Sequence, residues 1–490
     1  MSLTLDRPDL IHSDNLIDGR WRPAADGRRF GVFDPAGGAL LAEVADSSAA
    51  DARAATDAAA RALPAWRATP ARERAALLRA WHAAVIAHTE DLARLISLEQ
   101  GKPLAEARGE VGYGASYIAW FAEEATRIYG DLIPQQQRGK QMSAVKEAIG
   151  VVAAITPWNF PLAMIARKFA PALAAGCTVV AKPAEDTPLT ALALVALGVE
   201  AGLPPGVINL ITSSRDNAVP AVADWLHDPR VRKITFTGST QVGKYLARES
   251  AETLKKLSLE LGGNAPFIVF DDADVEAAVD GLIAAKFRNG GQTCVSPNRV
   301  FVQQGVYEQF AALLCKRVAA FKVAPASDSS AQIGPMINLR AVDKIARHVA
   351  DAVSHGARIL TGGTRLTELG AHYFAPTVLG DASSAMALAG EETFGPVVPL
   401  FRFSDEAEVV RAANDTPFGL AAYFYSQDLR RIARVSSALE TGIVGVNEGA
   451  ISSEAAPFGG VKESGYGREG SRYGLEDYLT TKYICQGGLV

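Results

Sequence analysis

Short apolar runs alternate with helix-length segments from Ala148 onward, and this alternation restricts the possible folds more than any other feature of the sequence. The runs read AIGVVAAIT, CTVVAKP, GVINLI and KITFTG, with helices expected from Pro161, from Pro188 and near Ala218. Apolar strands that alternate with helices predict a parallel sheet covered by helices on both faces. Such sheets bind ligands at the carboxyl ends of their strands, so functional residues are expected there.

A second alternating region begins near Pro266 with PFIVF, continues with a helix over residues 272–288 and extends to about Val444. We therefore predict an α/β protein with two such domains. The 490 residues, 48% of them hydrophobic, are sufficient for two to four domains with large cores.

Outside these regions the sequence predicts helices and a hairpin. Helical patterns cover residues 49–63, 70–88 and 89–99. Short polar–apolar alternation between about Ile128 and Val145 is typical of a protruding hairpin, and residues 473–489 are expected to form another strand region. An exposed apolar edge strand can pair with a second chain.

Charge and cysteine usage exclude several classes of protein. The net charge of −5 comes from interspersed residues without a long basic run, so a nucleic-acid partner is not expected. The N-terminus lacks a signal-peptide pattern, and no apolar run approaches membrane-spanning length. Cysteines 177, 294, 315 and 485 show neither metal-ligand nor disulfide-framework spacing. No metal is therefore expected, and we predict a reducing, cytoplasmic location.

Cys294 lies in the segment KFRNGGQTCVSPNR, between a helix expected to end at Gly290 and Gly291 and a strand expected from Arg299. A side chain at such a junction can face a cleft, which is where a nucleophile is expected. The alternative is a small buried residue, because free cysteine is among the most buried residue types. The segment alone does not decide between these interpretations.

Two further strand ends carry side chains suited to the chemistry of a nucleophilic cysteine. The first sheet strand runs into PWNFP, where Asn159 could cap the next helix or donate to an oxyanion. The strand KLSLE ends in Glu260, followed at once by LGGNAP. A carboxylate there is partly desolvated and suits general-base catalysis, although a loop-edge salt bridge is the alternative.

Two loops at the same edge suggest a nucleotide. GSTQVG at residues 238–243 opens a helix, so its backbone could approach a phosphate, but its spacing is not the G-x-G-x-x-G fingerprint. The preceding KPAE loop places Lys182 and Glu185 where they could bind ribose hydroxyls. A tight turn and solvated loop charges are the respective alternatives, and the two loops together make the stronger argument.

Seven segments occur in order over residues 155–465: ITPWNFP, KPAE, FTGST, LELGGNAP, GQTC, EETFGPV and PFGGVKESG. Together they resemble the NAD(P)-dependent aldehyde dehydrogenase superfamily across essentially the whole chain. The resemblance implies Cys294 as nucleophile, Glu260 as the base that activates water, and an oxyanion hole formed by the Asn159 amide and the Cys294 backbone N–H. A thiolate attacks the aldehyde, hydride leaves the adduct, and water hydrolyses the resulting thioester.

The same resemblance implies the cofactor site. The residues that it places around NAD(P) are Thr156, Pro157, Trp158, Lys182, Glu185, Gly238, Ser239, Gly243, Leu261, Glu392 and Phe394. A carboxylate at Glu185 accepts hydrogen bonds from a free ribose 2'-hydroxyl and repels a 2'-phosphate, so we predict NAD as the preferred cofactor. Lys182 could partly offset that repulsion and permit some use of NADP.

Within the superfamily the chain most resembles succinate-semialdehyde dehydrogenases, in segments such as KFRNGGQTCVSPNR and the closing LEDYLTTKY. That likeness implies a substrate carboxylate held by Arg167, Arg288 and either Ser452 or Ser453. Two guanidiniums near the nucleophile call for an anion. Ser296 stands where some of these enzymes carry a second cysteine, so no local disulfide switch is expected. Glutarate or 2-oxoglutarate semialdehyde, and a general non-acylating aldehyde dehydrogenase, are the alternatives.

The resemblance also implies the domain organisation. Residues 1–127 and 148–259 would form an NAD-binding domain of Rossmann type, and residues 260–445 a catalytic domain. Residues 128–147 and 470–490 would form a small oligomerisation sheet, which implies a homodimer or homotetramer.

Overall fold

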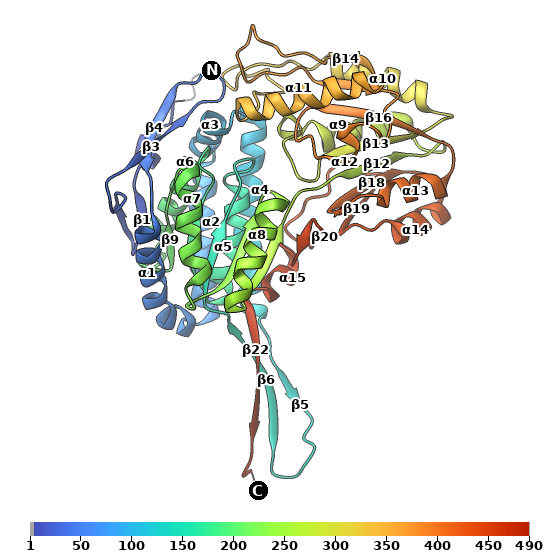
Figure 1. Ribbon diagram of the computed structural model, residues 1–490. Helices are drawn as coiled ribbons and strands as arrows, with labels where there is room; N and C mark the ends of the chain where they lie inside the picture. Colours follow the sequence, from blue (N-terminus) through green and yellow to red (C-terminus); the bar gives the residue numbers. More distant parts are fainter. Residues whose placement is uncertain (1–3, 490) are drawn as a thin grey trace.

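The computed structural model describes residues 4–489. Residues 1–3, at the start of the predicted NAD-binding domain, and residue 490, at the end of the predicted oligomerisation segment, lie outside the described residues. Two α/β bodies lie side by side, and a narrow three-stranded sheet extends away from them (Figure 1). The predicted α/β class is therefore confirmed. Within residues 4–489, no helix has both the length and the apolar character needed to cross a membrane.

The first body contains an eight-stranded sheet in the order β2-β1-β9-β8-β7-β10-β11-β21. Its strands are β1 (Asn15–Ile17), β2 (Arg20–Arg22), β7 (Val151–Ile155), β8 (Thr178–Lys182), β9 (Ile208–Leu210), β10 (Val231–Thr237), β11 (Lys256–Glu260) and β21 (Gly465–Tyr466). The five strands from β9 to β11 are parallel, as the alternation of apolar runs and helices predicts, whereas β1, β2 and β21 add antiparallel edges.

Helices cover both faces of this sheet, and strand β7 shows why its sequence is continuously apolar. Val152 and Ala154 pack with α2 to α6, while Val151, Ala153 and Ile155 pack with α1, α7 and α8. The helices are α1 (Ala49–Ala68), α2 (Ala71–Ala87), α3 (Thr89–Gln100), α4 (Leu104–Glu124), α5 (Ala163–Ala175), α6 (Leu189–Glu200), α7 (Arg215–His227), α8 (Thr240–Ser250) and α15 (Ser471–Glu476).

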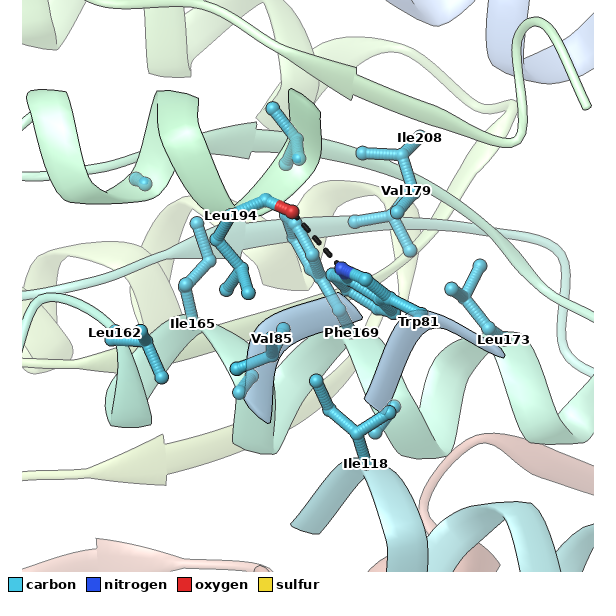
Figure 2. Packing of buried hydrophobic residues seen from close by; sticks show 14 of the residues in the cluster. Trp81, Val85, Ile118, Leu162, Ile165, Phe169, Leu173, Val179, Leu194 and Ile208 are labelled. Atoms are coloured by element: carbon cyan, nitrogen blue, oxygen red, sulfur yellow. Dashed lines mark hydrogen bonds between the residues drawn. The ribbon is translucent and has the colours of Figure 1, made fainter. Parts of the chain in front are cut away.

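Figure 2 shows the larger of these two cores, in which Trp81 of α2 packs beside Phe169 of α5. The indole is fully buried, and its Nε1–H donates a hydrogen bond of 3.0 Å to the carbonyl oxygen of Leu194. That bond satisfies the only polar atom of the tryptophan side chain, so the ring contributes apolar area without an unpaired donor. The same hydrogen bond links α2 to α6 on one face of the sheet.

The second body contains a seven-stranded sheet in the order β14-β15-β16-β13-β12-β18-β19, parallel except for β14. Its strands are β12 (Ala265–Val269), β13 (Pro297–Gln303), β14 (Arg358–Thr361), β15 (Thr377–Gly380), β16 (Val397–Phe403), β18 (Ala421–Tyr425) and β19 (Ile443–Val446). The flanking helices are α9 (Val275–Lys286), α10 (Tyr307–Ala319), α11 (Leu339–Ser354), α12 (Ala387–Gly390), α13 (Glu406–Asn414) and α14 (Leu429–Ala438).

The third sheet is antiparallel and consists of β5 (Asp131–Ile133), β6 (Gln141–Ala148) and β22 (Leu479–Gln486) in the order β22-β6-β5. Figure 1 shows it protruding from the first body with the C-terminus near its tip. Two small pairs complete the strands: β3 (Arg29–Phe33) with β4 (Leu40–Ala45), and β17 (Phe418–Gly419) with β20 (Val461–Lys462). The 3-10 segments are η1 (Pro8–Leu10), η2 (Ala125–Arg127), η3 (Ala251–Thr253) and η4 (Arg288–Gly291).

Candidate active site

A cavity of about 360 Å³ lies where the two bodies meet, and it brings together the three residues expected to carry the chemistry, Cys294, Glu260 and Asn159. Asn159 follows strand β7 and Glu260 ends strand β11, so the first sheet presents both at its carboxyl edge. Cys294 comes from the second body, between η4 and β13. The remaining wall is mostly apolar and aromatic, with Phe160, Met164, Leu261, Val295, Phe394 and Phe458 among its residues.

Cys294 is held in a tight turn that begins with two glycines of positive φ, Gly290 (61°) and Gly291 (78°). Its backbone also lies close to Gly263, where an added Cβ would come within 2.4 Å of the Cys294 carbonyl oxygen. The thiol is half-buried, and burial raises its pKa to about 12, with Glu392 and Glu260 adding to the effect. The cysteine is therefore a neutral thiol at pH 7.

Asn159 is buried, and its side-chain Nδ2 donates a hydrogen bond of 2.9 Å to the carbonyl oxygen of Gln292, two residues before Cys294. This bond fixes the direction of the amide and leaves its second N–H available. An amide held in this way, in a cavity shared with the thiol, is suited to donating to an oxyanion formed on the substrate.

Glu260 is 2% exposed, and neither of its carboxylate oxygens accepts a hydrogen bond from a described residue. Burial raises its pKa well above the usual range, and Glu469 raises it further. Gly459 packs directly against it, because a Cβ there would lie 2.8 Å from Glu260 Oε1. Burial therefore favours the protonated carboxyl, which becomes a base only when that proton leaves.

Arg167 and Arg288, the two predicted carboxylate-binding residues, both line the cavity but differ in their partners. Arg167 is 1% exposed, and its Nη2 lies 2.8 Å from Glu469 Oε2 while its Nη1 donates 3.2 Å to the Tyr113 hydroxyl. Arg288 is half-buried, and its guanidinium lies over the rings of Phe160 (4.7 Å) and Tyr113 (5.4 Å). Within residues 4–489, Arg288 makes no ion pair and no side-chain hydrogen bond.

The two candidate serines also occupy different places. Ser452 lines the cavity. The Ser453 hydroxyl instead accepts a hydrogen bond of 3.2 Å from the backbone N–H of Ala455, and its carbonyl oxygen accepts one of 3.4 Å from Tyr117. Of the two, Ser452 is therefore the one placed to meet a substrate.

A second cavity, of about 860 Å³, adjoins the first and shares with it Pro157, Trp158, Gly238 and Ser239. It also contains Thr156, Lys182 and Glu185, and the helix α8 opens into it with Ser239 as its N-cap, which leaves backbone N–H groups at its first turn. Gly243 does not line either cavity, since a Cβ there would lie 2.4 Å from Leu261 Cδ2.

The Glu185 carboxylate contacts two cations. Its nearest oxygens lie 3.1 Å from Arg215 Nη2 and 4.0 Å from Lys182 Nζ. Lys182 is buried, which lowers its pKa, and it also donates to the Pro183 carbonyl oxygen at 3.1 Å. The second cavity therefore combines a helix N-terminus, which suits a phosphate, with a carboxylate and a lysine, which suit ribose hydroxyls. This combination is suited to binding a dinucleotide.

Glu392 and Phe394 line the first cavity, and Phe394 packs edge-on against Trp158, a residue of both cavities, at a ring separation of 5.5 Å. Glu392 Oε1 accepts a hydrogen bond of 3.3 Å from the N–H of Gly263, and burial raises its pKa to about 7. Both residues therefore share the cavity with Cys294.

Sequence reasoning did not anticipate helix α4, which supplies Tyr113 to the cavity wall. The same helix carries Glu106 and Glu110, whose oxygens accept backbone N–H groups beside the site. The sequence does contain a signal for this face of α4, because three or four residues separate each of Glu106, Glu110, Tyr113 and Tyr117 from the next. Three glycines, at 109, 112 and 114, weaken the helical pattern.

The aldehyde dehydrogenase family model matches residues 21–484. The chain belongs to the aldehyde dehydrogenase family. It is 55% identical to succinate-semialdehyde dehydrogenase [NADP(+)] GabD of Escherichia coli (strain K12), over 99% of this chain and 100% of that protein. It is 54% identical to a 3-sulfolactaldehyde dehydrogenase of Pseudomonas putida, over 99% of each chain. A glutarate-semialdehyde dehydrogenase of Pseudomonas putida (strain KT2440) is 54% identical over 97% of this chain and 98% of that one.

These findings confirm the predicted family and identify the chain as an aldehyde dehydrogenase that uses NAD(P). An aldehyde dehydrogenase has to bring an aldehyde and a dinucleotide together, and the two adjoining cavities described above are the candidate sites for them.

Proposed function

We propose that this aldehyde dehydrogenase acts on aldehydes that carry a distal carboxylate, with succinate semialdehyde as the preferred substrate. The observation that carries this proposal is the guanidinium of Arg288, which lines the same cavity as Cys294 and forms no ion pair within residues 4–489. A guanidinium held over two aromatic rings keeps its N–H groups available for a carboxylate. The three relatives named above are described as acting on succinate, glutarate and sulfolactate aldehydes, and each of these substrates carries an acid group.

Arg288 and Ser452 are the proposed contacts to the carboxylate, with Arg167 as a supporting charge. Arg167 is already engaged by Glu469, so it would add to the positive potential and orient Tyr113 more than it would bind the substrate directly. Glutarate semialdehyde remains the main alternative, because one methylene changes a binding free energy by only about 1 to 3 kcal/mol.

The proposed reaction uses three side chains of the cavity. Cys294 gives its proton to solvent and its sulfur attacks the aldehyde carbon, while the Asn159 amide and the Cys294 N–H donate to the oxygen that becomes negative. NAD(P) held in the adjoining cavity would supply the hydride acceptor, so that the adduct on Cys294 becomes a thioester. Glu260, once ionised, takes a proton from water as the hydroxide attacks the thioester, and it passes that proton to the Cys294 sulfur when the acid leaves.

We propose NAD as the preferred cofactor, with NADP as a weaker one. The support is the Glu185 carboxylate in the nucleotide cleft, which would accept a ribose 2'-hydroxyl and repel a 2'-phosphate. Arg215 would weaken this preference for NAD, because its exposed guanidinium could break its ion pair with Glu185 and bind the 2'-phosphate of NADP instead. The Escherichia coli relative is named for NADP(+), so the balance between these charges is the point to test.

We further propose the domain organisation of residues 1–127 with 148–259, 260–445, and 128–147 with 470–490, the last acting as an oligomerisation sheet. Strand β21 supports a close connection between the NAD-binding and catalytic domains, because residues 465–466 return from the second body and pair with β11 beside Glu260. A reducing compartment such as the cytoplasm is proposed because the chemistry requires Cys294 as a free thiol.

The substrate proposal is tested by kcat/KM with NAD for succinate semialdehyde and for butyraldehyde, the same chain without its carboxylate. We expect a preference of about 100-fold or more in the wild type, since a lost charged contact is worth about 2 to 5 kcal/mol. Arg288→Met should reduce that preference to below about 10-fold, and Arg288→Lys should retain part of it.

Glutarate semialdehyde and 3-sulfolactaldehyde are measured in the same series to rank the acid groups and chain lengths. Equal kcat/KM values for succinate semialdehyde and butyraldehyde in the wild type would disprove the proposal. A preference that survives Arg288→Met would instead assign the carboxylate to another residue.

A further inference from the structure

Lys102 is a buried lysine that lies in the turn between α3 and α4, next to the loop that carries Asn159. Its side chain is 1% exposed, and its Nζ lies 2.6 Å from Glu110 Oε2. The same ammonium donates a hydrogen bond of 2.8 Å to the backbone carbonyl oxygen of Asn159 and lies 3.9 Å from the centre of the Phe160 ring. It therefore contacts the proposed oxyanion residue through the backbone carbonyl, not through the amide.

Glu110 holds the other end of the same loop. Its second oxygen, Oε1, accepts hydrogen bonds from the backbone N–H groups of Leu162 (2.9 Å) and Ala163 (3.2 Å), where α5 begins. The first turn of α5 has no side-chain cap of its own, so Glu110 takes that role from another helix. The Lys102–Glu110 ion pair thus fixes the backbone on both sides of Phe160 and Pro161.

Asn289 is a second donor to the Asn159 carbonyl oxygen. Its Nδ2 donates to that oxygen at 2.9 Å and is 3.4 Å from the carbonyl oxygen of Gln292, which also accepts the Asn159 amide. The Asn289 backbone has a left-handed φ of 52°, and its N–H donates 2.7 Å to Glu106 Oε2. Helix α4 therefore anchors both residues that hold the Asn159 carbonyl oxygen, Lys102 through Glu110 and Asn289 through Glu106.

Stability alone is a weak reason for this arrangement. Burying a lysine and a glutamate removes both from water, and an apolar pair of similar size often leaves a protein equally stable or more stable. What an apolar pair could not supply is the set of directed hydrogen bonds to the Asn159 carbonyl and the α5 N-terminus. A misplacement of about 1 Å in a catalytic group can lower a rate about 100-fold, so the direction of the amide matters more than the energy of the pair.

We propose that Lys102, together with Glu110, is a positioning residue that fixes the Asn159 amide for both tetrahedral oxyanions of the reaction, and Asn289 secures the same carbonyl from the cysteine side. This inference rests on the proposed role of Asn159 as an oxyanion donor. It assigns a role in the reaction to Lys102, Glu110 and Asn289, which do not line the cavity.

The test is a double-mutant cycle of kcat with saturating NAD and aldehyde, using Lys102→Met, Asn159→Ala and the double variant. We expect Lys102→Met to lower kcat about 10- to 100-fold with KM changed less than about 3-fold. Asn159→Ala should lower kcat about 100- to 1,000-fold, as is usual for the loss of one oxyanion donor. Adding Lys102→Met to Asn159→Ala should then cost less than about 3-fold, because the amide to be positioned is gone.

Lys255→Met is the matched control, since Lys255 is also buried and donates to two loop carbonyls, those of Asp228 and Val231, each at 2.7 Å. It should lower the Tm without changing kcat per active site, with active sites counted by alkylation of Cys294. If Lys102→Met does not fold, Asn289→Gly replaces it, because glycine accepts the positive φ and removes the amide. The same non-additivity with Asn159→Ala is expected.

The outcomes separate the two proposals. An unchanged kcat in Asn159→Ala would refute the oxyanion role of Asn159 and leave no group for Lys102 to position. If Asn159→Ala loses most of its kcat but Lys102→Met keeps full kcat, only the positioning role is refuted. The same holds if Lys102→Met lowers kcat by the same factor in the wild type and in Asn159→Ala.

Discussion

Burial acts on Cys294 and Glu260 in the same direction. It raises the pKa of the thiol to about 12 and the pKa of the carboxyl well above its usual range. The Glu260 charge also raises the pKa of Cys294, because both groups become anions in one cavity. The neutral form is therefore favoured for both groups, so the reactive thiolate has to be formed during the reaction cycle.

Alkylation of Cys294 by iodoacetamide measures this directly. Without nucleotide at pH 7.5, we expect the rate at Cys294 to be at least about 100-fold below that of free cysteine, whose pKa is about 8.5. Because the folded pKa is raised, the thiolate fraction and the rate should keep rising about tenfold per pH unit up to pH 10, with no plateau. The exposed Cys485 serves as the internal reference by peptide mass spectrometry. A plateau below pH 8 would show that the resting residue is already a thiolate.

Glu185 is the residue on which the cofactor preference depends. Glu185→Gln removes the negative charge but keeps a group that can bond to a ribose hydroxyl, so kcat/KM with NADP should rise about 10- to 100-fold while that with NAD falls less than about 5-fold. Arg215→Ala is the matched variant, and it should lower the residual activity with NADP because it removes the neighbouring cation. A wild-type enzyme that already favours NADP would reverse the proposed preference.

At the scale of elements, the parallel strands and the helices between them could be predicted because their periods are regular over long stretches. Strands β7, β8 and β9 fall within the segments predicted from apolar runs, whereas β10 begins two residues and β12 one residue before the predicted segment. Helix α4 could not be predicted from such a pattern, since its glycines and alanines dilute the apolar stripe.

The cavity shows the same contrast between local signals and tertiary contacts. Sequence motifs pointed to Cys294, Glu260 and Asn159, and the structure brings these three side chains into one cavity. The pairing of Arg167 with Glu469 joins residues about 300 positions apart, and no local pattern announces such a contact. Burial of Glu260 without a hydrogen-bond partner is likewise a property of the packing.

The glycines of α4 allow a direct test of how closely that helix must pack. A Cβ at Gly114 would lie 2.2 Å from Leu162 Cδ2 and 3.1 Å from Ala163 Cα, whereas a Cβ at Gly109 would meet nothing within 4 Å. Gly114→Ala should therefore destabilise the protein by about 1 to 3 kcal/mol through overpacking. Gly109→Ala should stabilise it by about 0.5 to 1 kcal/mol through helix propensity. Opposite shifts of Tm at one scan rate are expected, and equal shifts would contradict the close packing of α4 on α5.

At the scale of the whole molecule, the protruding sheet exposes two large apolar side chains on one face. Ile484 of β22 pairs with Ser143 of β6, which pairs with Leu132 of β5, so the three side chains share that face. Leu132 is 78% exposed and Ile484 is 44% exposed. A three-stranded sheet with exposed apolar side chains and two free edges is suited to pairing with another copy of the chain.

We therefore expect light scattering after size exclusion to give the wild type a molar mass of two or four chains. The double variant Leu132→Lys with Ile484→Lys should shift toward the mass of a single chain. Two charges on that face would have to be buried unpaired in the assembly, which disfavours association. Leu254→Lys is the control, because Leu254 is 88% exposed and lies on the first body, away from this sheet. A wild type that runs as a single chain, or a double variant that keeps the wild-type mass, would place any oligomer contact elsewhere.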